Sequence, residues 1–122
     1  MQSYRDLNAW QKSMQLVEDV YRMTKAFPRD ELYGLTAQIR RSAISIPSNI
    51  AEGKGRHSDR EFSQFLRHAR RSILELETQL LIGQRLKYVD DSAAEQLMKQ
   101  TAEIGRMLNG LLKAFREDSP RT

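Results

Sequence analysis

The stretch FSQFLRHARRSILELETQLLIG, residues Phe62 to Gly83, carries an apolar or small residue at every third or fourth position. These positions are Phe62, Leu66, Ala69, Ile73, Leu76, Leu80 and Gly83. Alternating steps of three and four are typical of a helix that buries one face, whereas a strand alternates with a period of two. The stretch therefore predicts one long helix with a single buried face.

The same spacing recurs in three other segments. Their apolar positions are Leu7, Trp10, Met14, Val17, Tyr21 and Thr24; Leu32, Leu35, Ile39, Ala43, Ile46 and Ile50; and Ala94, Leu97, Thr101, Ile104, Leu108, Leu111 and Phe115. We predict helices over about residues 7–26, 31–53, 59–87 and 92–116, with frayed ends at 1–5 and 117–122. Because the connections are short, consecutive helices should be antiparallel. The expected fold is all-α, a single domain over residues 1–122 built as an up-down-up-down four-helix bundle.

The composition narrows the functional classes. The chain has 122 residues, of which 39% are apolar and 30% charged, and it has no cysteine. This composition excludes thiolate chemistry and disulfides, and no apolar run is long enough to span a membrane or to act as a secretory signal. We expect a cytoplasmic protein with no membrane association.

Some apolar side chains fall outside these four stripes. The first helix has a second stripe, and two leucines of the third helix point away from its predicted core face; these residues are Leu16, Val20, Met23, Phe27, Leu74 and Leu81. A single bundle has no second core for them, so we expect them at contacts between subunits of a homo-oligomer. The simpler interpretation is a wide first face and scattered exposed leucines.

Basic residues concentrate between Arg40 and Arg71, where eight cations face three anions, although the whole chain has a net charge of only +4. Five of them form a row along the outer side of the third helix and the turn before it, and two lie nearby: Arg56, Arg60, Arg67, Arg70 and Arg71, with Arg41 and Lys54. Guanidinium groups suit phosphate, because they offer paired donors and keep their charge. The basic row predicts salt-sensitive binding of RNA or DNA, and the alternative is an ordinary solvated face.

Catalytic and metal chemistry lack support. His57 and His68 lie eleven residues apart, about 16 Å along one helix, so they cannot share a metal ion. No triad spacing orients a histidine against a serine. The Gly53-Lys54-Gly55 segment fails as a phosphate loop, because Ser48 stands where that motif needs a glycine and Gly55 where it needs Ser or Thr. We expect no enzyme activity, no cofactor and no metal.

Pro47 lies inside the second predicted helix, in SIPSNIAEGKGR, residues Ser45 to Arg56. It removes one backbone donor and crowds the carbonyl of Ala43. Because Ile46 and Ile50 continue the apolar stripe, we predict a kinked but continuous helix. The small side chains Ser45 and Ser48 on its outer side would allow close approach by a neighbouring subunit, and the freed carbonyl could accept from water, from Asn49 or from that subunit.

Two segments resemble a known family. FPRDELYGLTAQIRRSAISIPSNIAEGKGR and EFSQFLRHARRSILELETQLL are similar to the four-helix bundles first found in intervening sequences of bacterial 23S rRNA genes. The resemblance runs from about Leu7 to Leu112, and its most specific parts are Ser45–Gly53 and Glu75–Gln79. Arg71 departs from the family pattern, which usually has glycine there.

The resemblance implies a cytosolic bundle that forms a ring, commonly a homopentamer. It also implies kinship with accessory proteins of diversity-generating retroelements, which are basic pentamers that bind nucleic acid and a reverse transcriptase. It supplies no catalytic residues. Two hypotheses follow: an oligomer that binds structured RNA or DNA through the basic row, or a protein-interaction ring in which those arginines are solvated or pair with acids of a neighbour.

Overall fold

The computed structural model describes residues 3–115, and these residues form helices and no strand. The elements are the 3-10 turn η1 (Tyr4–Asp6), α1 (Asn8–Thr24), the 3-10 turn η2 (Arg29–Glu31), α2 (Leu35–Lys54), α3 (Asp59–Arg85) and α4 (Asp91–Ala114). The predicted all-α four-helix bundle is confirmed. The fraying expected at residues 1–2 and 117–122 lies outside the described residues, whereas residues 4–6 form the turn η1.

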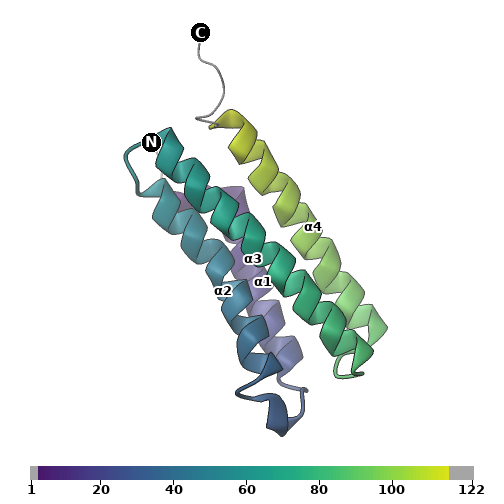
Figure 1. Cartoon of the computed structure of the whole chain (residues 1–122). Coiled ribbons are helices and arrows are strands. Elements are labelled where there is room, and N and C mark those ends of the chain that lie inside the picture. Colours follow the sequence, from purple (N-terminus) through teal and green to yellow (C-terminus); the bar gives the residue numbers. More distant parts are fainter. Residues whose placement is uncertain (1–2, 116–122) are drawn as a thin grey trace.

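The four helices run side by side (Figure 1). The α1–α2 and α3–α4 connections lie at one end, and the α2–α3 turn lies at the other. Each helix packs on the next in chain order, and α1 also packs on α4, which closes the bundle. As a result α1 and α3 lie diagonally opposite each other.

The core confirms the predicted face of three helices and corrects that of α1. All seven positions read from Phe62 to Gly83 are buried, as are most of those predicted in α2 and α4. In α1, however, the buried residues are Ala9, Ser13, Leu16, Val20 and Thr24, followed by Phe27 beyond the helix. Of the predicted stripe, Met14 and Tyr21 are 39% and 37% exposed, and Thr24 alone is buried. Its other members, Leu7, Trp10 and Val17, are half-buried at the edge of the core.

The prediction that Leu16, Val20 and Phe27 make subunit contacts is therefore wrong, because they are buried inside their own chain. Met23 is half-buried and packs against the same core. The cause of the error is Ser13, whose hydroxyl interrupts the true apolar stripe. It donates to the carbonyl of Ala9 at 2.6 Å, so the polar group is satisfied without leaving the core.

The start of α2 also differs from the prediction. The helix begins at Leu35 rather than near residue 31, because the chain first makes the turn η2 and reaches its N-cap at Gly34. Gly34 has no side chain to cap the helix, so the Glu31 carboxylate accepts the Leu35 amide at 3.0 Å. This places the cationic residue Arg29 on a separate turn at the corner between α1 and α2.

Helix α2 continues through Pro47, which is buried, and the kink expected there stays a prediction. Gly53 lies inside this helix rather than ending it. A Cβ atom on Gly53 would stand 2.6 Å from the Cβ of Phe65, so the missing side chain lets α2 and α3 approach closely. This approach positions the first turns of α3, where the basic row begins.

A chain of hydrogen bonds joins α2 to α3. The Asn49 amide donates to the carbonyl and hydroxyl of Ser45, rather than to the carbonyl that Pro47 leaves free. Ser45 Oγ lies 2.7 Å from Ser72 Oγ, and Ser72 donates to the carbonyl of His68. Because the Ser72 proton is used on His68, Ser45 is the donor between the two hydroxyls.

Candidate nucleic-acid interface

The basic row follows the outer side of α3 and the turn before it. Arg60, Arg70 and Arg71 are exposed, and Arg67 is half-buried. Arg60, Arg67 and Arg71 share a face, since steps of three or four residues return to the same side of a helix. From Arg60 to Arg71 they extend over about 16 Å of the axis at 1.5 Å per residue. The structure therefore brings the central part of the predicted row together.

The first residues of the basic row are less available to a ligand than the sequence indicated, because they already have contacts within the chain. Arg56 forms an ion pair with Glu52 at 2.9 Å, and its guanidinium stacks over the Phe65 ring at 4.9 Å. Lys54 lies 5.8 Å from the centre of the Phe62 ring. An acid at the end of α2, four residues earlier in the chain, thus neutralises the first arginine of the row.

Two further arginines have neutral partners. Arg70 donates to Asn109 Oδ1 of α4 at 3.0 Å, and Arg71 donates to His68 Nδ1. Neither forms an ion pair within residues 3–115, and the same holds for Arg60. Arg41 is exposed on α2, outside the row. These contacts orient Arg70 and Arg71 while leaving their positive charge uncompensated.

The predicted subunit contacts that face solvent are Ser48, Leu74 and Leu81. Leu74 is 60% exposed and Leu81 is 45% exposed. Ser45 is half-buried and tied to Ser72. Sequence reasoning missed a second apolar surface, a groove of about 310 Å³ between α1 and α2. Its lining is Tyr4, Trp10, Met14, Val17, Ile44, Pro47, Ser48 and Ala51.

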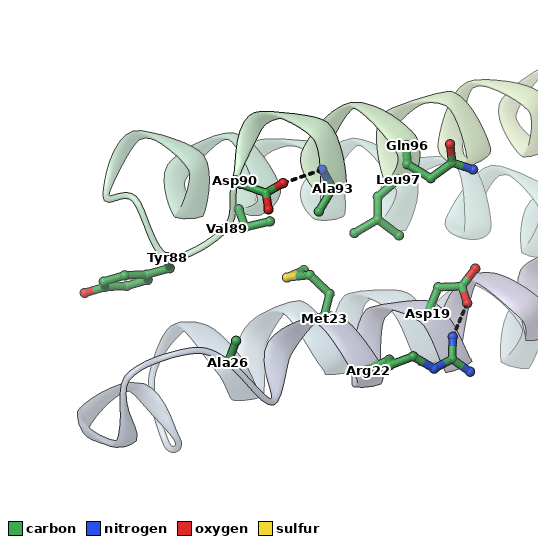
Figure 2. A pocket seen from close by; sticks show the side chains of 10 residues that line it. All are labelled: Asp19, Arg22, Met23, Ala26, Tyr88, Val89, Asp90, Ala93, Gln96 and Leu97. Carbon is green, nitrogen blue, oxygen red and sulfur yellow. Dashed lines mark hydrogen bonds and ion pairs between the residues drawn. The ribbon is translucent and has the colours of Figure 1, made fainter.

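A mainly apolar pocket of about 410 Å³ lies between α1 and the start of α4 (Figure 2). Figure 2 shows Met23 and Leu97 pointing toward one another across it, with the Asp19–Arg22 ion pair at the rim. The Asp90 carboxylate accepts the Ala93 amide at 2.7 Å and caps α4. Of its polar side chains, Asp19 and Arg22 pair with each other, Asp90 caps α4 and Tyr88 donates to Glu31 outside the pocket.

Asp19 connects α1 to α4 beside this pocket. Burial alone would raise the pKa of the Asp19 carboxyl, but hydrogen bonds from Gln100, Arg22 and Gln15, with the charge of Arg22, outweigh it and lower that pKa. At the end of the bundle, Tyr88 donates its hydroxyl to Glu31 Oε2 at 3.0 Å. This hydrogen bond, followed by burial and the charges of Glu31 and Asp30, raises the pKa of Tyr88.

Comparison with known proteins identifies the family. The family model described as 23S rRNA-intervening sequence protein matches residues 5–110. The chain belongs to this family. A crystal structure from Bacteroides thetaiotaomicron, described as a protein with unknown function from the S23 ribosomal protein family, has the same fold with a TM-score of 0.78. It shares 23% sequence identity, and the alignment covers 88% of the present chain and 98% of that one. No curated protein matches the chain significantly.

Membership of the 23S rRNA-intervening sequence protein family brings no catalytic assignment. Within residues 3–115 no three His, Asp or Glu side chains gather in a way that could hold a metal ion. None of the helices in that part of the chain combines the length and apolarity needed to cross a membrane. The basic row is therefore the feature of this family member from which function can best be argued.

Proposed function

We propose that this protein is a non-enzymatic, cytoplasmic helical-bundle protein that assembles into a ring, commonly of five subunits in the family it resembles, and binds structured RNA or DNA through the basic row. The observation that supports binding is that Arg60, Arg70 and Arg71 of α3 are exposed and form no ion pair among residues 3–115; Arg60 and Arg71 share a face, and Arg70 lies beside it toward α4. A ring would repeat this face and concentrate the charge, which strengthens attraction to a polyanion.

The apolar surfaces support assembly. The exposed leucines belong to α3, whereas the groove lies between α1 and α2. Two unlike surfaces on one chain suit a head-to-tail contact between copies, and such contacts close into rings when the rotation permits. A reverse transcriptase or another protein is a further partner that the family resemblance suggests.

The binding test uses a structured RNA hairpin and fluorescence anisotropy at about 50 to 200 mM salt. Changing Arg60, Arg67 and Arg71 together to Gln should largely abolish binding at about 50 mM, because phosphate contacts supply most of the affinity. The control variant changes Arg85, Lys99 and Arg106 to Gln, which removes the same charge elsewhere and should retain most binding. No binding by the wild type, or equal loss in both variants, would sink the proposal.

Assembly is measured on the same samples by light scattering, with and without the hairpin. A multiple of the 14.2 kDa chain mass is expected, and a monomer would contradict the ring. The second candidate is a protein-interaction ring without a nucleic-acid role, favoured by the Arg56–Glu52 ion pair, which shows an arginine of this row already neutralised. Under it the triple variant would change the assembled mass and leave no nucleic-acid effect.

A further inference from the structure

A second group of cations lies at the opposite end of the bundle from the α2–α3 turn. A cavity of about 410 Å³ opens at the corner between α1 and α2. Among residues 3–115, three basic residues line it, Lys25, Arg29 and Arg40, and no acidic residue does. They come from the end of α1, from the turn η2 and from α2, so the fold brings together residues that no single helix face contains.

Arg40 is held rigidly in this corner cavity. Its Nε donates to Thr24 Oγ at 2.8 Å, and its guanidinium carbon lies 4.4 Å from the centre of the Tyr21 ring. One terminal nitrogen also lies 3.5 Å from the carbonyl of Tyr21. The free carbonyls at the C-terminal end of α1 attract a cation, and this explains why Arg40 lies here. They do not explain why Arg29, on the turn η2, lines the same cavity. A guanidinium fixed in place loses little conformational entropy when it binds an anion.

Thr36 adds a neutral hydroxyl to the corner cavity. The residue is only 3% exposed and lines the cavity, and its hydroxyl forms no hydrogen bond with another described residue. This oxygen is not among the described side-chain oxygens that are both buried and unpartnered, so water or a ligand in the cavity can reach it. The hydroxyl is therefore available to an oxygen-bearing ligand as a donor or an acceptor.

The acidic residues nearest in the chain do not neutralise the three cations of the corner cavity. Asp30 and Glu31 follow Arg29 in the chain but do not line the corner cavity. The Glu31 carboxylate is occupied by the Leu35 amide and the Tyr88 hydroxyl. None of the three cations forms an ion pair within residues 3–115. An anion that enters the cavity would therefore meet three basic residues that are not already paired with an acid among residues 3–115.

We propose that the corner cavity binds a phosphate monoester, with Lys25, Arg29 and Arg40 on its oxygens and the Thr36 hydroxyl as a neutral partner. A monoester carries up to two negative charges near neutral pH, which suits three converging cations better than a singly charged diester. Phe27, Pro28 and Leu32 supply an apolar wall for the organic part of the ligand. The site is independent of the basic row, and neither proposal requires the other.

The test titrates the labelled full chain with inorganic phosphate at constant ionic strength and follows its amide resonances. Saturable shifts are expected within residues 24–36, and chloride at equal ionic strength should not reproduce them. Changing Lys25 and Arg29 together to Gln should weaken binding by about tenfold or more, since each charge-assisted hydrogen bond is strong. Thr36→Val, which keeps the shape, should weaken it by about threefold.

The matched control changes Lys12 and Arg22 to Gln, which removes the same charge from α1 outside the cavity. Binding should persist in this variant, and also in the triple variant of the basic row, so failure of one proposal is distinguishable from failure of the other. Shifts that follow chloride equally, or phosphate affinity unchanged by the Lys25 and Arg29 changes, would overturn the site.

A second arm identifies the source of the phosphate. An oligonucleotide with a 5′-phosphate is compared with the same strand ending in a 5′-hydroxyl. Tighter binding of the phosphorylated strand that depends on Lys25 and Arg29 supports the site and assigns it to nucleic-acid ends. Equal binding of the strands, with inorganic phosphate still bound, supports the site and assigns it to a small phosphate-bearing molecule.

Discussion

Helices α1 and α3 lie diagonally across the bundle and are connected to their neighbours by different chemistry. The links from α1 involve charged side chains near the surface: Asp19 with Gln100, and Thr24 with Arg40. The links from α3 include buried hydroxyls, as Ser63 donates to the carbonyl of Phe115 and Ser72 accepts from Ser45. The Asp19 link of α1 should therefore respond to pH and the two serine links of α3 should not, although α3 also has a carboxylate link, from Thr101 to Glu77.

Apolar packing is common to both helices, and its loss has the largest expected effect. Leu16→Ala in α1 and Leu66→Ala in α3 each remove a fully buried side chain, so each should lower the free energy of unfolding by about 2–5 kcal/mol. The outward changes Met14→Ala and Leu74→Ala should cost less than about 1 kcal/mol. Urea unfolding followed by circular dichroism measures all four. If Met14→Ala cost as much as Leu16→Ala, the corrected face of α1 would be wrong.

Replacing a buried serine of each helix should change the free energy of unfolding by less, but by different amounts in α1 and α3. Ser63→Ala removes the donor to the Phe115 carbonyl and should lower the free energy of unfolding by about 1 kcal/mol. Ser13→Ala should change it by less than about 0.5 kcal/mol, because the Ala9 carbonyl keeps its backbone hydrogen bond and alanine favours the helix. The same urea titration measures both, and equal costs would mean that the cross-helix hydroxyl of α3 adds nothing.

The smallest effect concerns pH. Because the pKa of Asp19 is lowered in the folded protein, its ionised form stabilises the fold above the unfolded pKa of about 3.9, and this contribution is lost as pH falls through the folded pKa. Asp19→Asn should therefore cost at most about 1 kcal/mol at pH 7 and nothing near pH 2. Thermal unfolding at the two pH values tests this. A difference that persists at pH 2 would locate the effect in packing rather than charge.

The diagonal pair also shows what a sequence can reveal. In α3 the apolar stripe is unbroken from Phe62 to Gly83, and arginines occupy part of the opposite side, so periodicity identifies the buried face. In α1 both sides are apolar, and the true core stripe is interrupted by Ser13. Its hydroxyl is satisfied by the preceding turn, a local hydrogen bond that hydropathy does not register.

The candidate nucleic-acid interface, like the buried helix faces, could be predicted from the sequence only in part. The central arginines of the basic row share a face because helix geometry is local. The ion pair of Arg56 with Glu52 was also open to prediction, because the two residues are four positions apart at the end of α2 and the turn after it. The corner cavity was not, since Lys25, Arg29 and Arg40 come together only when the α1–α2 connection is folded. Sequence patterns describe one helix face well, and they miss sites assembled from several elements.

Hydrogen bonds run from Asn49 through Ser45 and Ser72 to His68, and they affect how α3 is positioned against α2 along the bundle axis. Each hydroxyl has a single proton and uses it once, so the sequence of donors runs in one direction. Sliding α3 past α2 by one turn, about 5.4 Å, would separate the two serines and break the hydrogen bond between them. Together with the close approach of Phe65 to Gly53, this hydrogen bond favours one axial register of the two helices, and with it the height at which the arginines of α3 give way to its exposed leucines. Any neighbour that meets both surfaces must match that height.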